Sequence, residues 1–269
     1  MAATKVNSHI STVDSVLQFA GMPVPVRTTL IRLDDDSGYV LFSPLCIDSD
    51  IIDTLIGEKN ILAIVAPNAY HHLWAHKAME KYPEAKLISS PALSRRFPNS
   101  NWGKPLDVKQ NGKPLLAAHD ELTAFVVPST TDEIVLFHAP SRTLICADLA
   151  FNFTADQVAQ MPWYGRLYLK TTMRRAVCVS EMFRYVFTNA DAALAVVEQL
   201  LQLPFDTLIV AHGDNVLLDA RQALTLGTYN WLVEIARSRK ESHAVRNTLL
   251  LTALIGAASF AMYKKCNEQ

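Results

Sequence analysis

The sequence has few cysteines, and those it has are far apart. Cys46, Cys146, Cys178 and Cys266 are the only four in 269 residues, and no two have the short spacing of a metal-binding or redox pair. This argues against both a disulfide framework and a zinc ribbon, and it fits a reducing compartment. Three of the four lie within apolar runs, where we expect small buried hydrophobic residues.

An excess of charge of either sign is also missing. The 25 Lys and Arg residues and 26 Asp and Glu residues give a net charge of −1 and are well mixed along the chain. No nucleic-acid partner is expected, because phosphate backbones are bound by clustered basic residues. A secretory signal is not expected either, since Met1–Asn7 has no apolar core with a small-residue cleavage site.

Hydrophobic residues, by contrast, make up 50% of the chain. One uncharged stretch, Asn247–Tyr263, spans roughly 17 residues, or about 25 Å as a helix, near the short limit for crossing a bilayer. Arg246 precedes it and Lys264 and Lys265 follow it, as at the ends of membrane helices. We expect a tail anchor that holds the rest of the chain in the cytosol, on the outer mitochondrial membrane or the endoplasmic reticulum. An ordinary buried terminal helix is the alternative.

Between the two ends, strand-like and helix-like segments alternate. We expect strands at 26–33, 38–45, 61–66, 86–89, 121–127, 133–138, 143–147 and 207–211. We expect helices at 48–56, 73–81, 91–96, 191–203 and 217–240, and a largely helical segment at 154–187. This order predicts an α/β (α+β) fold with two sheets between outer helices. Residues 1–15 are expected to be disordered, 16–240 to form the domain and 241–246 to be a linker.

Three of the predicted strands end at an imidazole or a carboxylate. His71 and His72 follow the first of these strands, Asp148 follows the second, and His212 follows the third. Strand ends at one edge of an α/β sheet are where such folds bind ligands. Histidine and aspartate together suit zinc, iron or manganese. We therefore expect a site for one divalent metal ion, zinc before iron or manganese, made by His71, His72, Asp148 and His212.

The order of these residues resembles the metallo-β-lactamase superfamily, whose fold is an αβ/βα sandwich. There, H-x-H-x-D-H after a strand is followed by a histidine in a P-G-H-like loop, an aspartate at a strand end and a histidine in a late H-G. Asp148 matches the aspartate, His212 the late histidine, and His72 the last histidine of the first motif. The segment PNAYHHL at 67–73 is most similar to a poorly characterised branch, a domain of unknown function, in which P-N-x-x-H-H-L replaces that motif. The resemblance covers roughly residues 26–240.

The departures from the family pattern reduce the site. Pro67 and Ala69 stand where the first two metal-binding histidines belong, and the P-G-H loop falls near Thr130. His71 replaces the aspartate of the first motif. The resemblance therefore implies one metal ion at most, or none. With a metal it implies hydrolysis of a small-molecule substrate of unknown kind, with Asp148 as ligand and acceptor for water; without one, it implies a membrane-tethered docking domain.

Each site residue also has a structural alternative. Adjacent residues point apart on a regular strand or helix, so one of His71 and His72 could cap the following helix. Asp148 could cap its strand end through backbone amides. The turn after the last strand could be a plain one, with Gly213 in a left-handed conformation.

Other polar residues near the motifs have weaker claims. Asn68 could orient a substrate or donate to a histidine, but after a proline it is equally a turn residue. His76 lies one helical turn after His72, and we expect it to be an exposed helix histidine. His119 and His138 lie on or beside predicted strands and are expected to be non-ligands.

Overall fold

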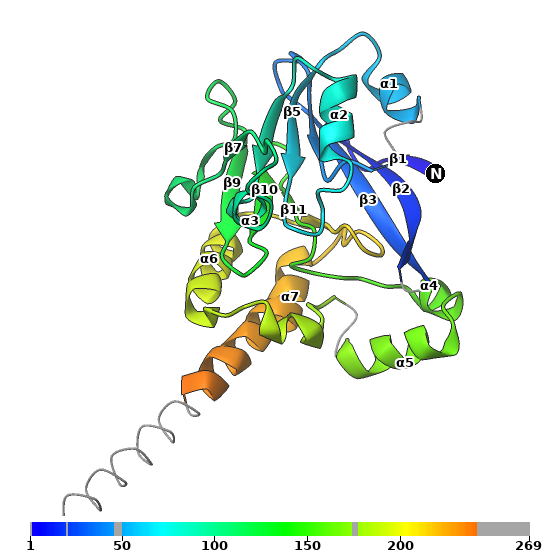
Figure 1. Cartoon of the computed structure of the whole chain (residues 1–269), viewed down its shortest axis with the longest axis vertical. Coiled ribbons are helices and arrows are strands. Elements are labelled where there is room, and N and C mark those ends of the chain that lie inside the picture. Colours follow the sequence, from blue (N-terminus) through cyan, green and yellow to red (C-terminus); the bar gives the residue numbers. More distant parts are fainter. Residues whose placement is uncertain (1, 20, 46–49, 174–176, 241–269) are drawn as a thin grey trace, which may run out of the picture.

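Two β-sheets lie face to face and helices cover their outer faces in the computed structural model, which describes residues 2–19, 21–45, 50–173 and 177–240 (Figure 1). The first sheet has seven strands in sequence order. They are β1 (Ala2–Lys5), β2 (Ile10–Phe19), β3 (Met22–Arg32), β4 (Tyr39–Phe42), β5 (Ile61–Ala66), β6 (Lys86–Ser89) and β7 (Lys104–Pro105). Pairing is antiparallel from β1 to β4 and parallel from β4 to β7.

Short helices connect the parallel strands of this sheet. They are α1 (Ile51–Ile56), α2 (Ala75–Lys81) and α3 (Pro91–Arg96). Their buried side chains pack with Leu30, Leu41 and Ile64 of the sheet. The parallel crossovers thus place three helices on the outer face of this sheet.

The second sheet has five strands in the order β12-β11-β10-β9-β8. They are β8 (Lys113–Pro114), β9 (Leu122–Val127), β10 (Glu133–His138), β11 (Thr143–Ile145) and β12 (Thr207–Ile209), and a 3₁₀ turn η1 (Val108–Gln110) precedes them. The helical elements after β11 are α4 (Ala155–Ala159), α5 (Trp163–Thr172), η2 (Glu181–Tyr185), α6 (Ala190–Gln202), α7 (Ala220–Leu224) and the π-turn η3 (Thr225–Tyr229). Helical residues 230–240 continue from η3.

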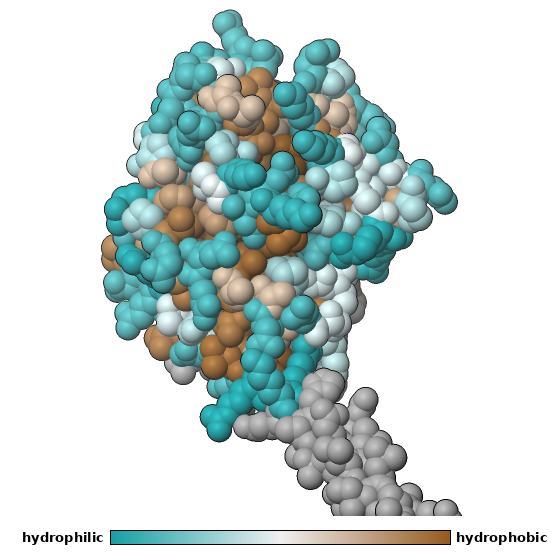
Figure 2. Space-filling view, turned by 90° about the vertical axis from the view of Figure 1, so that its left-hand side faces the viewer, coloured by the Kyte–Doolittle hydropathy of each residue, from teal (hydrophilic) through white to brown (hydrophobic). Residues whose placement is uncertain are grey.

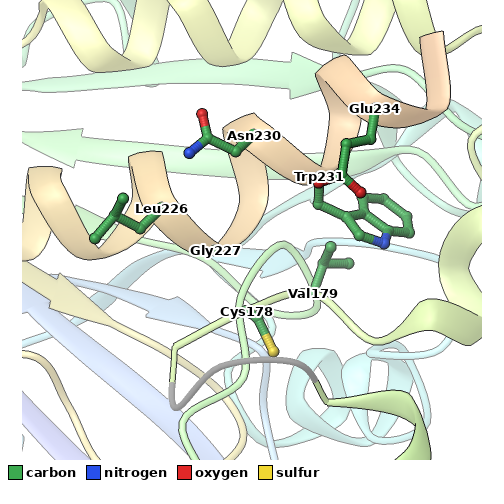
Figure 3. Close-up of a pocket in the computed structure, with 7 residues that line it drawn as sticks. All are labelled: Cys178, Val179, Leu226, Gly227, Asn230, Trp231 and Glu234. Carbon is green, nitrogen blue, oxygen red and sulfur yellow. The ribbon is translucent and has the colours of Figure 1, made fainter. Parts of the chain in front are cut away.

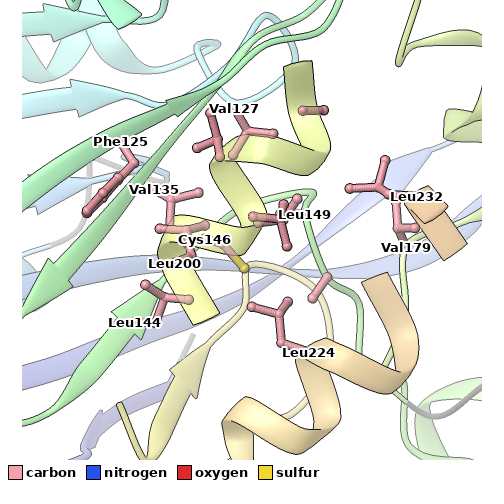
Figure 4. Close-up of a cluster of buried hydrophobic side chains, with 14 of the residues drawn as sticks. Phe125, Val127, Val135, Leu144, Cys146, Leu149, Val179, Leu200, Leu224 and Leu232 are labelled. Carbon is pink, nitrogen blue, oxygen red and sulfur yellow. The ribbon is translucent and has the colours of Figure 1, made fainter. Parts of the chain in front are cut away.

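The alternation of side chains along β10 shows how the layers are held. Ile134 and Leu136 pack between the two sheets, whereas Val135 and Phe137 face the cluster formed with α6 and the C-terminal helical segment (Figure 4). A strand buried on both faces has a continuous apolar run, here residues 134–137, which is why this segment was predictable. The result is the four-layer order helix, sheet, sheet, helix that the sequence predicted.

The N-terminus differs from the expectation of disorder over residues 1–15. Residues 2–5 form β1, and β2 pairs with β3 along its whole length from Ile10 to Phe19. Ile10, Thr12 and Val13 are buried there. Antiparallel pairing with the longer β3 stabilises this polar-looking strand, which its own composition does not indicate.

One further expectation needs adjustment, and another lies outside the described residues. The segment 154–187, expected to be largely helical, contains α4, α5 and η2 separated by non-helical residues. The expected linker 241–246 and tail anchor Asn247–Tyr263 lie outside the described residues. Within the described part of the chain, no helix has both the length and the apolar character needed to cross a membrane. On the face shown in Figure 2, hydrophobic side chains form separate areas among hydrophilic ones.

Candidate metal centre

Three of the four residues expected at the strand ends meet at one edge of the sandwich. His71 follows β5, Asp148 follows β11, and His212 follows β12. The two histidine Nε2 atoms are 3.0 Å apart, and Asp148 Oδ1 is 3.4 Å from His71 Nε2 and 3.3 Å from His212 Nε2. The three side chains are at most 10% exposed. Both sheets therefore contribute to one buried set of two imidazoles and a carboxylate.

The spacing of these donor atoms fits a single divalent ion. Zinc binds imidazole nitrogen and carboxylate oxygen at about 2.0–2.2 Å, so two ligand atoms at tetrahedral angles lie about 3.3 Å apart. The observed separations of 3.0–3.4 Å agree with this value. Two imidazoles and one carboxylate also leave a position for water or substrate, as in catalytic zinc sites. Iron and manganese accept the same donors.

Hydrogen bonds on the far side of each ring orient the two histidines. His212 Nδ1 is 2.8 Å from the carbonyl oxygen of Pro25, which can only accept, so Nδ1 carries the proton. His71 Nδ1 is 2.9 Å from Ser43 Oγ. The Phe151 ring stacks on His212 with centroids 5.1 Å apart. A neutral ring protonated at Nδ1 presents the Nε2 lone pair to the cluster, which is the usual state of a metal-binding histidine.

A buried asparagine connects the first motif to the carboxylate. Asn68 Nδ2 donates to Asp148 Oδ2 at 2.9 Å and lies 3.4 Å from Glu133 Oε2. Its side-chain oxygen accepts the backbone N–H groups of Tyr70 and His71. Asn68 is therefore both a turn residue and a donor to the site, and it leaves only Oδ1 of Asp148 facing the histidines.

Sequence reasoning missed Glu133, the first residue of β10. This side chain is 6% exposed, and its carboxylate accepts the backbone N–H groups of Ala147, Asp148 and Leu149 at 2.8, 3.0 and 3.1 Å. Glu133 thereby fixes the turn that follows β11. An acidic residue at the start of a strand is usually exposed, so no sequence signal distinguished this one.

The pKa values of the two buried carboxyl groups, Asp148 and Glu133, are shifted in opposite directions. Burial alone would raise the pKa of Asp148, but when His71 and His212 are protonated their charges and hydrogen bonds outweigh it and hold the pKa well below its usual range. Burial, followed by the negative charge of Asp148, raises the pKa of Glu133 to about 7 despite its backbone hydrogen bonds. Asp148 is thus the ionised partner that a metal requires.

His72 lies outside this cluster, which corrects the expected four-residue set. Its ring packs against Phe97 and Trp102, with centroids 5.0 and 5.3 Å away. Burial, and then the charge of Arg96, lower the pKa of His72. Adjacent side chains diverge in the turn before α2, so only His71 reaches the other two ligand atoms. His76 also stays apart, with Nε2 2.8 Å from the carbonyl oxygen of Asn101.

A glycine turn positions His212. Gly213 has φ +93°, and a Cβ there would lie 1.9 Å from the carbonyl oxygen of Asn152. The backbone N–H of Asn152 donates to the His212 carbonyl at 3.0 Å, and Asp214 N–H donates to the Asn152 carbonyl at 2.8 Å. The left-handed glycine expected in the plain-turn alternative is present, and the same turn also delivers the imidazole.

A separate pocket of about 410 Å³ lies beside the C-terminal helical segment (Figure 3). It is lined by Cys178, Val179, Leu226, Gly227, Asn230, Trp231 and Glu234. None of the three clustered residues lines it. The pocket therefore does not define the substrate position of the metal centre.

Solved structures of other proteins share this fold. No family model and no curated protein sequence matches the chain. The metallo-β-lactamase FIM-1 from Pseudomonas aeruginosa, in its mono-zinc form, matches over 87% of this chain and 95% of its own, with 14% identity and a TM-score of 0.58. A metallo-β-lactamase from Pontibacter korlensis matches over 84% and 96%, with 13% identity and a TM-score of 0.55. The chain has the metallo-β-lactamase fold.

The same fold occurs in an oxidoreductase. Rubredoxin oxygen:oxidoreductase from Desulfovibrio gigas matches over 86% of this chain but 61% of its own, with 17% identity and a TM-score of 0.60. The resemblance predicted from Asp148, His212 and the first motif is thus confirmed for the metallo-β-lactamase fold. Identities this low establish the architecture and leave the reaction to the residues of the site.

Proposed function

We propose that His71, Asp148 and His212 hold one divalent metal ion and that the protein is a metal-dependent hydrolase. The observation that carries the proposal is the convergence of three donor atoms at 3.0–3.4 Å from one another. Zinc is the first choice, because two imidazoles and a carboxylate with an open position are typical of catalytic zinc. When bound, such an ion lowers the pKa of water and polarises a scissile carbonyl or ester.

The residues of the chain have separate roles in this proposal. His71 and His212 present Nε2 because Ser43 and Pro25 engage their Nδ1 atoms. Asp148 stays ionised, and its Oδ1 atom, which faces the two histidines, would both bind the ion and act as the acceptor for water in the site. Asn68 holds the other oxygen of that carboxylate at 2.9 Å and so fixes its plane.

Metal analysis of the full-length protein tests the centre. We expect His212→Ala to contain one equivalent less metal than the wild type, because it removes a ligand. His76→Ala, an exposed histidine bonded elsewhere, should keep the wild-type content. Equal metal in wild type and His212→Ala would refute the centre.

Turnover distinguishes hydrolysis from the alternative of a docking domain. The alternative is supported by Pro67, Ala69 and Thr130, which cannot supply the ligands of a second metal. Panels of esters, thioesters and lactones, with zinc, iron or manganese added, should show activity that Asp148→Asn abolishes. A protein that binds metal without hydrolysing any class in the panel would favour docking.

We also propose that Asn247–Tyr263 anchors the protein to a membrane, with the domain in the cytosol. The support is the uncharged run of the sequence between flanking basic residues. The outer mitochondrial membrane is preferred, since the run is short, with the endoplasmic reticulum as the alternative. A chain ending at Lys240 should stay in the aqueous phase on detergent partitioning, and the full chain should not. Equal solubility without detergent would contradict the anchor.

A further inference from the structure

A second cluster of metal-type ligands lies at the opposite edge of the sandwich. It consists of His9, Asp34 and His138, whose ligand atoms all lie within 4.8 Å of one another. β10 relates the two edges, because it begins at Glu133 behind the first centre and ends at His138. At about 3.3 Å per residue, these ends are about 17 Å apart. The second cluster is therefore spatially independent of the first.

Asp34 lies between the two imidazoles. Its Oδ1 atom is 3.1 Å from His9 Nδ1 and 3.8 Å from His138 Nε2. The two rings lie 5.1 Å apart between centroids. His138 is completely buried, while the side chains of His9 and Asp34 are 21% and 43% exposed. The cluster thus has a buried base and one side open to solvent.

Two of the three ligand atoms are buried without a hydrogen bond in the described part of the chain. They are His9 Nδ1 and His138 Nε2. His9 Nδ1 lies 3.1 Å from Asp34 Oδ1 without hydrogen-bond geometry, and His138 Nε2 lies 3.8 Å from it, beyond hydrogen-bond reach. A buried polar atom with no partner costs about 1–3 kcal/mol, so His138 Nε2 above all calls for a ligand. Each belongs to a ring that faces the same carboxylate oxygen. The unmet atoms are therefore directed into one place rather than scattered over the surface.

The hydrogen-bond chain behind His138 identifies Nε2 as a lone pair. Ser141 Oγ donates to Thr143 Oγ1 at 2.9 Å, which in turn donates to the Ser141 carbonyl at 3.0 Å. With its proton used, Ser141 Oγ can only accept from His138 Nδ1, at 2.8 Å. Ser141 N–H also lies 3.4 Å from this nitrogen, but a protonated Nδ1 has no lone pair to accept it, so the shorter contact to Ser141 Oγ decides the tautomer. Nε2 therefore faces the carboxylate oxygen as a second acceptor.

We propose that His9, Asp34 and His138 bind a second divalent transition-metal ion of the zinc class. Two acceptors that face one another require an electropositive species between them, and two imidazoles with one carboxylate select zinc-like ions over magnesium or calcium, which prefer oxygen ligands. The Nδ1–H···Ser141 bond is the outer contact that metal-binding histidines commonly make. The open side beside Asp34 leaves room for water ligands.

Nearby polar groups complete the surroundings of this second centre. Glu121 accepts the Asp34 backbone N–H at 3.3 Å, and His119 Nδ1 is 3.3 Å from the Glu121 carboxylate. Asp35 Oδ1 is 4.0 Å from His119 Nδ1. Two further carboxylates, Glu121 and Asp35, thus lie close to Asp34, and their negative charge favours a cation.

An ion at this place would join three segments distant in sequence. His9 lies directly before β2, Asp34 lies two residues after the end of β3, and His138 ends β10 of the other sheet. The expected role is structural, tying the N-terminal hairpin to the second sheet. Zinc in 100-fold excess over its Kd should raise the Tm by about 5–10 °C.

The experiment uses the full-length His71→Ala/His212→Ala protein, so that only the second centre remains. After loading with zinc and dialysis, we expect about one equivalent by elemental analysis and about two in the wild type. Adding His138→Gln or Asp34→Asn should remove that equivalent and the Tm shift, whereas adding His76→Gln, an exposed and separately bonded histidine, should not. Asp34 is partly exposed, so its variant remains informative if His138→Gln does not fold.

Each outcome separates the two centres. The second centre is refuted if the double variant keeps less than about a tenth of an equivalent, or if Asp34→Asn binds as much zinc as its parent. A wild type with one equivalent that the double variant lacks supports the first centre and refutes the second. A wild type with only one equivalent, which the double variant retains and Asp34→Asn removes, supports the second centre and refutes the first.

Discussion

A single side chain that is not a ligand, Asn68, holds several groups of the first centre in place. Asn68 is 1% exposed and contacts both buried carboxylates while its oxygen holds two backbone N–H groups. Asp148 would otherwise keep a buried oxygen without a donor. The hydrogen bonds of a buried network strengthen one another, so the loss of one member weakens the rest. A substitution at Asn68 is therefore expected to affect both the stability of the fold and the metal site.

We expect Asn68→Ala to lower the free energy of unfolding by about 2–3 kcal/mol, since it strands buried acceptors. Metal affinity at the first centre should fall about 10- to 100-fold. Urea unfolding and competition with a chromogenic chelator measure the two effects. Asn60→Ala, at an exposed position, serves as the control and should change stability by less than about 0.5 kcal/mol. An Asn68→Ala protein with unchanged metal affinity would show that Asp148 needs no such support.

The ligand residues at the strand ends could be predicted from the sequence, but the residues that orient them could not. His71, Asp148 and His212 each follow an apolar run, so their common edge could be predicted. Glu133 and Pro25 act through contacts with residues far along the chain, and neither stands in a recognisable pattern. His72 was misplaced because adjacent histidines give no indication of which one faces the edge.

At the scale of elements, turns and helix ends decide where the ligands stand. Gly213 allows the chain after β12 to approach the Asn152 backbone, and the helices α1 and α2 are linked through Asp53. This carboxylate accepts from Tyr82 Oη and lies 2.7 Å from Lys81 Nζ, both at the end of α2.

Gly213→Ala should destabilise the protein by more than about 2 kcal/mol, because φ is +93° and the Cβ would overlap the Asn152 carbonyl. The matched control is Gly57→Ala, where φ is +61° and no atom lies within 4 Å of the Cβ position. The control should lose only the backbone term, about 1 kcal/mol. Thermal unfolding of both variants measures the difference. Equal losses would mean that the turn relaxes.

We expect Asp53 to make a pH-dependent contribution to the free energy of unfolding. Burial would raise the pKa of Asp53, but its hydrogen bonds to Lys81 and Tyr82 outweigh this and lower it. A lowered folded-state pKa stabilises the protein above the ordinary value of about 3.9, and this contribution is lost as the pH falls through the folded-state pKa. Asp53→Asn should therefore cost about 0.5–1 kcal/mol at pH 7, a modest amount because solvent screens the pair. The difference from wild type should shrink below about pH 4 in urea titrations; a constant difference would contradict the ionic origin.

The whole molecule was predicted better in its centre than at its ends. Apolar strands such as 133–138 and the order of the motifs indicated a sandwich, and the structure has that architecture. β2 escaped prediction because ISTVDSVLQF mixes polar and apolar residues, and only its pairing with β3 defines it as a strand. Long-range pairing is not encoded in local composition.

The reactivity of the buried Cys146 thiol reports whether this part of the protein opens to solvent. Its side chain is buried between β11 and the helical layer (Figure 4), and burial raises the pKa of its thiol well above the ordinary value. A buried neutral thiol is a poor nucleophile, so maleimide should not label it in the folded protein at pH 7.5 within minutes. Peptide mapping by mass spectrometry should find full labelling in urea. Fast labelling under native conditions would show that the second sheet opens locally.

The first centre draws its donors from both sheets, with His71 from one and Asp148 and His212 from the other. A chain in which either half is folded alone would have no complete donor set. Metal affinity at this centre is therefore linked by mass action to the docking of the two halves. During refolding, the moment at which metal becomes bound would therefore report when the two halves dock, independently of how early each sheet forms.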